Sequence, residues 1–123
     1  MLVTVYTGSY NIAASEDHTP LVRWMFDTTM KNSVERQAAE VAVPELTEEM
    51  IASGAGGYKA MCEHCHGGPG VEPDAFSRGM LPQPPHLQEA AAEWEITEVF
   101  WLAKHGAKMT GMPAWTMART VLA

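Results

Sequence analysis

The chain has 123 residues, a length that corresponds to one domain. Its formal net charge is −7, and nucleic-acid binding needs a basic face, so the charge argues against DNA and RNA as partners. No apolar run approaches the roughly 18 residues that a membrane-spanning helix needs. The apolar start, "MLVTVY", is short and lacks the charged flank and the small-residue cleavage site of a signal peptide.

The first part of the chain divides into an irregular segment and a helix. Residues 1–20 are predicted to be extended or irregular, because β-branched residues are followed by Gly8 and other residues typical of turns. A helix is predicted over about 21–41, where the stretch "VERQAAEVAV" contains good helix formers. Pro44 is expected to stop this helix, since proline cannot supply the next backbone hydrogen bond.

A second helix is predicted to lead directly into the cysteines. Thr47 is a favourable N-cap, and the two glutamates that follow it suit the positive end of a helix. The helix is expected to run from Glu48 into Cys62. Its interior holds residues that each cost a helix roughly 1 kcal/mol relative to alanine. These residues are Gly54, Gly56 and Gly57. They indicate either the close approach of another element or a broken helix.

The remainder of the chain is predicted to hold one more long helix. Residues 67–85 are rich in glycine and proline and are predicted to be loop. A helix is predicted over 87–105, with Gly106 as its C-cap. "KMTGMP" is predicted to be loop, and "AWTMARTVLA" has room for two helical turns at most. Because no segment alternates strictly between apolar and polar residues, the fold class is predicted to be all-α.

The stretch "MCEHCHGGPG" holds both cysteines, Cys62 and Cys65, and places His66 directly after the second. A redox dithiol is expected at the start of a helix that follows a strand, whereas this pair is expected at the end of a helix. A structural zinc site needs four ligands, usually in two closely spaced pairs. The chain has no second pair, so zinc would need both thiols, His66 and one distant histidine.

The third chemistry, covalent haem attachment, needs the pattern Cys-x-x-Cys-His. Each thiol adds to one vinyl group, and the adjacent histidine is presented to the iron. The iron then takes a sixth ligand from the opposite side, for which a methionine thioether is the soft, neutral choice. Met112 in "TGMPAW" is the candidate, with Met109 as its main competitor. His86 and His18 are the alternatives that would give a bis-histidine iron.

The residues around the motif carry a family resemblance. The stretch "GAGGYKAMCEHCHG" resembles the start of class I c-type cytochromes, which place a glycine eight residues and an aromatic residue four residues before the first cysteine, here Gly54 and Tyr58. "KMTGMPAW" is similar to their axial methionine loop, and "LPQPPHL" resembles the proline-rich loop beside their haem. "EWEITEVFWLAKHG" resembles the helix that precedes their methionine loop. The segment "YNIAASEDHTPLVRWMFDTTMKNSVERQA" also resembles the front extension of a membrane-anchored bacterial group of monohaem cytochromes.

The resemblance implies an all-α, cytochrome c-like fold around one covalently bound haem c. It implies a haem domain over residues 44–123, after an N-terminal extension over residues 1–43. His66 and Met112 are then the axial ligands of the haem iron. The residues that the resemblance places at the haem are Cys62, Cys65, His66, Met112, Tyr58, Pro85 and Trp115.

The end of the chain departs from the family pattern. Class I cytochromes carry a long C-terminal helix that crosses the N-terminal helix at the glycine before the motif. Here the sequence stops ten residues after Pro113, so the C-terminal end is shortened and Gly54 lacks its usual partner. Three explanations compete: the helix over 21–41 replaces the missing one, a neighbouring subunit supplies the packing, or the chain is an atypical or truncated member.

An iron with both axial positions filled favours one-electron transfer over catalysis, so the protein is predicted to be an electron carrier and not an enzyme. Its expected partners are a donor dehydrogenase or quinol complex and an acceptor oxidase or reductase. One alternative is a haem sensor or peroxidase-like protein with an open sixth position, and another is a structural electron-wire subunit of a larger complex. The motif resembles that of proteins matured outside the bacterial cytoplasm, so the expected location is the periplasm or the periplasmic face of the inner membrane. "MLVTVY" is then interpreted as the stub of an upstream membrane anchor.

Overall fold

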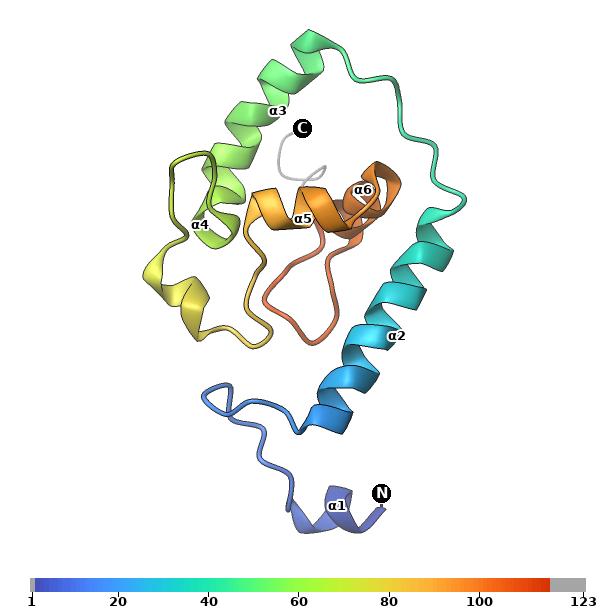
Figure 1. The fold of residues 1–123 in the computed structure, drawn as a ribbon, viewed down its shortest axis with the longest axis vertical. Helices are drawn as coiled ribbons and strands as arrows, with labels where there is room; N and C mark the ends of the chain where they lie inside the picture. Colours follow the sequence, from blue (N-terminus) through green and yellow to red (C-terminus); the bar gives the residue numbers. More distant parts are fainter. Residues whose placement is uncertain (1, 116–123) are drawn as a thin grey trace.

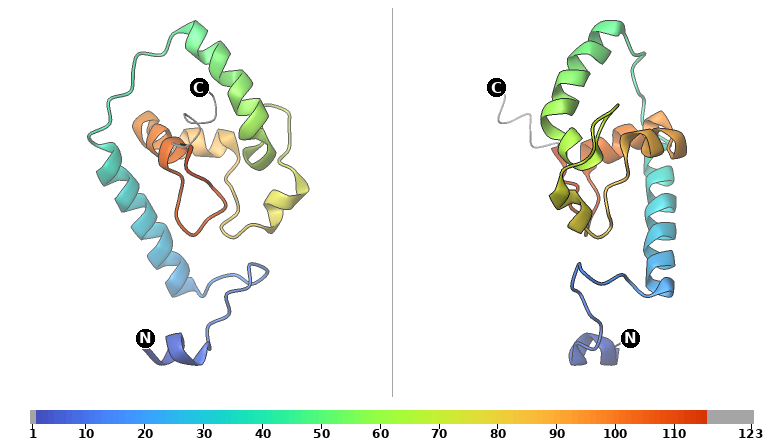
Figure 2. Two further views of the ribbon diagram at one scale, coloured as in Figure 1. Left: turned by 180° about the vertical axis from the view of Figure 1, so that it is seen from behind. Right: turned by 60° about the vertical axis from the view of Figure 1, so that its left-hand side comes forward.

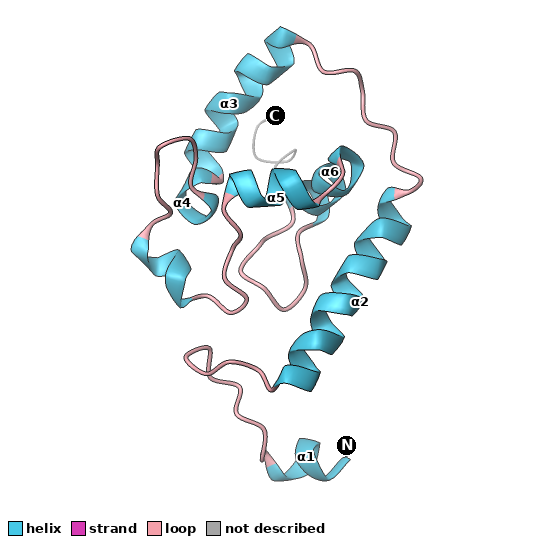
Figure 3. Ribbon diagram, in the orientation of Figure 1, coloured by secondary structure: helices cyan, strands magenta, loops and turns pink. Residues whose placement is uncertain are grey.

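The fold was analysed in a computed structural model, which describes residues 2–115. These residues form helices joined by loops, and no strand occurs among them (Figure 3). The predicted all-α class is therefore confirmed. In chain order the elements are α1 (Leu2–Thr7), α2 (Pro20–Ala38), α3 (Glu48–Met61), α4 (Glu63–His66), the 3₁₀ helix η1 (Ala75–Gly79), α5 (Leu87–Glu93) and α6 (Ile96–His105).

Helix α2 packs against α6, far along the chain (Figure 1). The contact lies toward the C-terminal end of α2, where Val34 and Ala38 are 3% and 2% exposed. The first turns of α2 extend beyond α6, and Leu21 and Trp24 there are exposed. Helix α2 therefore contacts α6 through its C-terminal half.

Helix α3 lies on the other side of the domain from α2, and the extended segment 39–47 joins the two (Figure 2). A Cβ atom added at Gly54 would meet no atom within 4 Å. The expectation that the helix over 21–41 packs at Gly54 is therefore wrong for the described residues, because α2 contacts α6 instead. The predicted division of the chain after residue 43 falls within the 39–47 segment and stays a prediction.

The helix predicted over 87–105 is wrong in one respect, because it is broken into α5 and α6 at Trp94 and Glu95. Glu95 starts a capping box: its side chain accepts a hydrogen bond from the third residue of α6, and its own backbone N–H donates to Glu98 at 2.8 Å. This reciprocal cap satisfies backbone donors that a continuous helix would have bonded internally. Gly106 ends α6 with a φ of 66°, as predicted for a C-cap.

Two segments predicted to be irregular contain short helices. Residues 2–7 form α1, in which the Thr7 hydroxyl donates to the Val3 carbonyl at 2.7 Å. The loop over 67–85 contains η1, where Ser77 is 1% exposed. Local hydrogen bonds contribute to closing these short helices. The helix predicted over 21–41 is confirmed as α2, although it ends at Ala38, before Pro44.

The segment before α2 folds back onto its first turns. The Tyr10 hydroxyl lies 2.7 Å from His18 Nδ1, and the two rings stack with centroids 6.0 Å apart. The ring of Phe26 lies 5.4 Å from that of His18 on a tilted plane. Within residues 2–115 no helix is both long and apolar enough to cross a membrane. The part of "AWTMARTVLA" that follows Trp115 lies outside the described residues.

Candidate functional site

Cys62 stands between two helices, as the C-cap of α3 and the N-cap of α4. Its backbone N–H donates to Tyr58 O at 2.8 Å, and its carbonyl accepts from the N–H groups of Cys65 at 3.1 Å and His66 at 2.9 Å. Positions i, i+3 and i+4 lie on one face of a helical turn. The turn therefore presents two thiols and an imidazole in the same direction, and all three side chains are half-buried.

The two thiols are free, and the pKa of Cys62 is raised, first by burial and then by the neighbouring Cys65. A redox dithiol needs the opposite effect, since its attacking thiol is activated by a lowered pKa. In the described part of the chain, no group of three or more histidine, cysteine, aspartate or glutamate residues is arranged to hold a metal ion. Neither finding favours a redox dithiol or a zinc site, and both are compatible with covalent haem attachment at this turn.

His66 is oriented by the proline-rich loop. Its Nδ1 atom lies 2.8 Å from the carbonyl oxygen of Pro85. A carbonyl only accepts, so Nδ1 must carry the proton and donate, which leaves the lone pair on Nε2. A hydrogen bond on the far nitrogen fixes both the tautomer and the ring plane of a histidine ligand. Pro85 thus lies at the predicted site, and its backbone oxygen is the group that acts.

Tyr58 links the end of α3 to the end of the turn over residues 62–66, which is called the attachment turn below. Its hydroxyl donates to the Gly67 carbonyl at 2.6 Å. The pKa of Tyr58 is raised by burial and, to a smaller extent, by the charges of Cys62 and Glu63. Gly67 has a φ of 61°, and a Cβ atom there would lie 2.8 Å from His86 Nε2. The chain can therefore leave α4 in this direction only with glycine at position 67.

The methionine loop, which covers residues 106–113, is held against the end of α6. Gly106 has a φ of 66°, and a Cβ atom there would lie 2.6 Å from the carbonyl carbon of Pro113. The backbone N–H of Ala107 donates to the Met112 carbonyl at 3.3 Å. The Thr110 hydroxyl donates to the Ala107 carbonyl at 2.8 Å and accepts from the N–H of Met112 at 3.1 Å. These contacts close the loop over residues 106–113 on itself.

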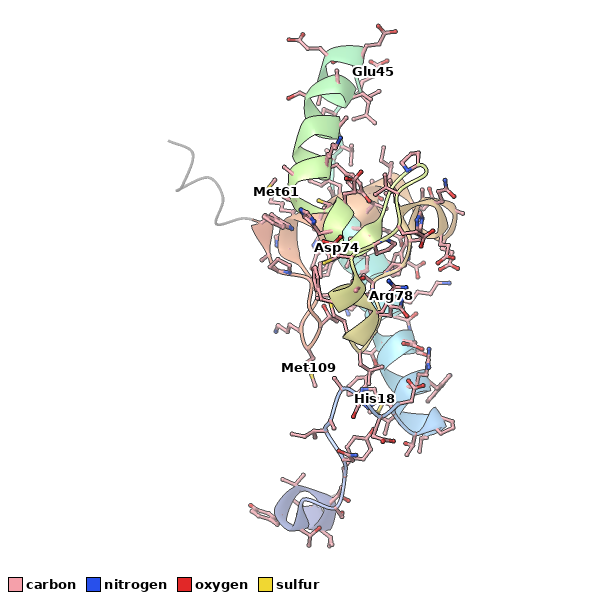
Figure 4. The ribbon with its side chains drawn as sticks, turned by 90° about the vertical axis from the view of Figure 1, so that its left-hand side faces the viewer. His18, Glu45, Met61, Asp74, Arg78 and Met109 are labelled. Carbon is pink, nitrogen blue, oxygen red and sulfur yellow. The ribbon has the colours of Figure 1, made fainter. Side chains whose placement is uncertain are left out.

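The two candidate methionines occupy different surroundings in this loop. Met112 is half-buried, whereas Met109 is 83% exposed with a φ of 61° at the outer end of the loop (Figure 4). Trp115, also proposed at the haem, is half-buried at the end of the described residues. His18 is engaged by Tyr10 in the N-terminal extension (Figure 4). His86 lies beside Gly67, on the side of the attachment turn.

Sequence reasoning missed two contacts around the site. Asp74 holds the attachment turn through two atoms: its N–H donates to the His64 carbonyl at 2.9 Å, and its Oδ2 lies 2.9 Å from His64 Nδ1. The Met80 sulfur lies against Gly111, the residue before Met112. Neither residue stands in a recognisable motif. These contacts join residues that are far apart in the sequence, and a single sequence does not reveal which distant residues lie close together in space.

The residues present fit a haem c. The donor set supplies two thiols for thioether bonds and a histidine with its Nε2 lone pair directed away from its own hydrogen bond. The elements that precede and follow the attachment turn also carry large apolar side chains that are between 40% and 56% exposed. These residues are Met61, Phe76, Val99 and Phe100.

A helical domain with this turn and a closing methionine loop defines a c-type cytochrome, a protein of haem-based electron transfer. In the comparison with protein families, residues 49–120 match the model described as cytochrome c oxidase, cbb3-type, subunit III. The match covers more than half of the chain, which belongs to this family of c-type cytochromes. Neither the search of curated proteins nor the search of solved structures gave a match.

Proposed function

We propose that the protein carries one electron at a time on a single haem c, attached through Cys62 and Cys65 and ligated by His66 and Met112. The observation that carries the proposal is the hydrogen bond of 2.8 Å between His66 Nδ1 and the Pro85 carbonyl. It leaves Nε2 available on the face that also presents the thiols. When bound, the haem supplies a metal centre that changes its charge by one electron without making or breaking covalent bonds.

The chain's own residues orient the groups that would hold this centre. The Pro85 carbonyl makes the His66 imidazole more basic by accepting a hydrogen bond from its Nδ1–H. Tyr58 fixes the attachment turn from α3. The closed loop over residues 106–113 supports a half-buried Met112, which suits a thioether ligand from the opposite side. Because these contacts fix the ligand residues in advance, we expect their positions to change little when the iron is oxidised or reduced.

The ligand assignment is tested by the absorption spectrum of the ferric holoprotein. Wild type is expected to show the weak long-wavelength band of sulfur bound to iron and to resist carbon monoxide in the ferrous form. Met112→Leu should lose the band and bind carbon monoxide, whereas the matched control Met109→Leu should keep the wild-type spectrum. A band that depends on Met109 would overturn the assignment. Rapid carbon monoxide binding by wild type would instead support the sensor or peroxidase-like alternative.

We propose redox proteins as partners: a dehydrogenase or quinol complex as donor and an oxidase or reductase as acceptor. The family described as subunit III of a cbb3-type oxidase supports membership of such a chain of carriers, either as a shuttle or as a fixed subunit. With a net charge of −7, docking to a basic face should slow as ionic strength rises. Stopped-flow electron-transfer rates that do not change with salt would contradict this steering.

We propose the periplasm, or the periplasmic face of the inner membrane, as the location. The support is the attachment motif, which resembles that of cytochromes matured outside the cytoplasm, together with the apolar exposed residues of α1. Fractionation of cells that express the full gene tests the proposal. Haem-loaded protein in the periplasmic or membrane fraction is expected, and haem-loaded protein in the cytosol would contradict it.

A further inference from the structure

Met80, in the loop after η1, touches the methionine loop. A Cβ atom added at Gly111 would lie 2.8 Å from the Met80 sulfur and 3.3 Å from its methyl carbon. The thioether therefore packs directly on the Cα atom of Gly111, the residue that precedes Met112. A side chain at position 111 would require the end of the Met80 side chain or the loop to shift.

Met80 is tied back to the attachment turn through a series of hydrogen bonds. Its backbone N–H donates to the Ser77 carbonyl at 3.2 Å. The Ser77 hydroxyl, which is almost completely buried, donates to the Asp74 carbonyl at 2.8 Å. Asp74 in turn binds His64 through its backbone N–H at 2.9 Å and through its carboxylate. His64 stands between the two attachment cysteines.

Among the described residues, the hydrogen bonds of residues 107–112 in the methionine loop do not reach any other element. Gly106 holds its two ends together through the approach of Pro113, but this contact does not restrain the middle of the loop. The side-chain contact from Met80 is thus the tertiary contact that the structure places directly before Met112.

We infer that Met80 is a positioning residue for Met112. Its side chain, anchored through η1 to the attachment turn, fills the space beside Gly111 and limits the movement of the loop there. Truncating it gives the loop freedom and weakens the bond between the Met112 sulfur and the iron, because more loop entropy must be lost to form that bond. The inference rests on the proposed His66/Met112 ligation.

The experiment measures how tightly imidazole displaces the methionine ligand from the ferric holoprotein of the full chain. Met80→Ala is expected to raise the imidazole affinity about tenfold, the change that corresponds to 1.4 kcal/mol, and to lower the reduction potential. Met80→Leu, which keeps the packing volume without the sulfur, should stay close to wild type. Met109→Ala is the matched control, since that side chain is 83% exposed in the same loop.

Gly111→Ala tests the same contact from the other side, and it should also raise the imidazole affinity because its methyl group collides with Met80. The double variant Met80→Ala/Gly111→Ala should recover part of the loss, since the new methyl group then occupies the freed space. A purely structural loss would add in the double variant, and additivity would overturn the inference. These comparisons use folded holoprotein, verified by circular dichroism.

Two further outcomes are distinguishable. If Met80→Leu loses the sulfur-to-iron band while Met112→Leu retains it, Met80 is itself the ligand and the positioning role is wrong. If wild type has no such band and binds imidazole freely, the proposed ligation fails regardless of Met80. Unchanged imidazole affinity in Met80→Ala, with the wild-type band intact, would overturn the positioning role and leave the ligation standing.

Discussion

The Nδ1 atom of His66 lies 2.8 Å from the carbonyl oxygen of Pro85, so the attachment turn and the proline-rich loop meet across 19 positions of the chain. A proline offers a backbone carbonyl but no N–H, so in this pair Pro85 accepts the hydrogen bond and His66 donates it. The imidazole plane is thereby set by the loop as well as by the turn. The site depends on one loop, over residues 67–85, that supports a helical turn of four residues.

Tyr58→Phe removes one hydroxyl and leaves the Gly67 carbonyl without its partner at 2.6 Å. We expect the free energy of unfolding to fall by about 1 kcal/mol, the typical net value of one part-buried hydrogen bond. Denaturant unfolding of the holoprotein measures the change. Tyr6→Phe is the control, because Tyr6 is 85% exposed in α1 and its hydroxyl should contribute nothing. Equal losses in both variants would contradict the role of the bond.

The raised pKa of Tyr58 predicts how stability changes at alkaline pH. Burial, the main cause, favours the neutral phenol in the folded state, so the folded pKa lies above the ordinary value of 10.0. This contribution is complete below pH 10.0 and is lost as the pH rises through the folded pKa, since the unfolded chain then releases its proton first. Unfolding midpoints of wild type should fall more steeply above this pH than those of Tyr58→Phe. Parallel curves would contradict the prediction.

Gly106→Ala should destabilise the protein severely. The new Cβ atom would lie 2.6 Å from the Pro113 carbonyl carbon, at a backbone φ of 66°. Gly8→Ala separates the two effects, because Gly8 has a φ of 63° with no atom within 4 Å of its Cβ position. The φ alone costs about 1 kcal/mol, which both variants should show. Thermal unfolding should reveal a further loss only in Gly106→Ala, and equal shifts would argue against the close approach.

Ala38→Glu tests the packing of α2 on α6. Ala38 is 2% exposed, so a glutamate there must either bury its charge or push α2 away, at a cost of at least about 2 kcal/mol. Ala39→Glu is the matched control, since the next residue is exposed. Limited proteolysis should cut Ala38→Glu faster within residues 39–47, where the chain has no helix. Equal cleavage of both variants would contradict the α2–α6 contact.

Local rules predicted the elements next to the haem motif, and long-range contacts escaped them. Thr47 was recognised as the cap of α3, and its hydroxyl accepts from the Met50 N–H at 3.2 Å. Gly106 was recognised in the same way as the C-cap of α6. The break between α5 and α6 was missed because the Glu95–Glu98 capping box lies inside a run of good helix formers. Contacts such as Met80 with Gly111 follow from the fold and have no periodicity in the sequence.

The family resemblance supplied what the residue pattern alone left open. The spacing of Cys62, Cys65 and His66 allows three chemistries, and the comparison with the family model supports the hypothesis of covalent haem attachment. The hydrogen bond from His66 to a proline carbonyl could not be predicted, because any residue can offer a carbonyl. When a backbone atom orients a ligand residue, the amino-acid sequence does not show which residue supplies that atom.

The segment over 39–47 gives the α2–α6 contact a further property. Because the segment that joins α2 to α3 is short and has no helix, α2 can be treated as a ligand tethered next to α6. The fraction of molecules in which α2 contacts α6 then depends on an effective concentration, which is in the millimolar range for short flexible tethers. A weak contact can therefore stay closed within one molecule, and a longer tether would dilute it without changing any residue of the interface.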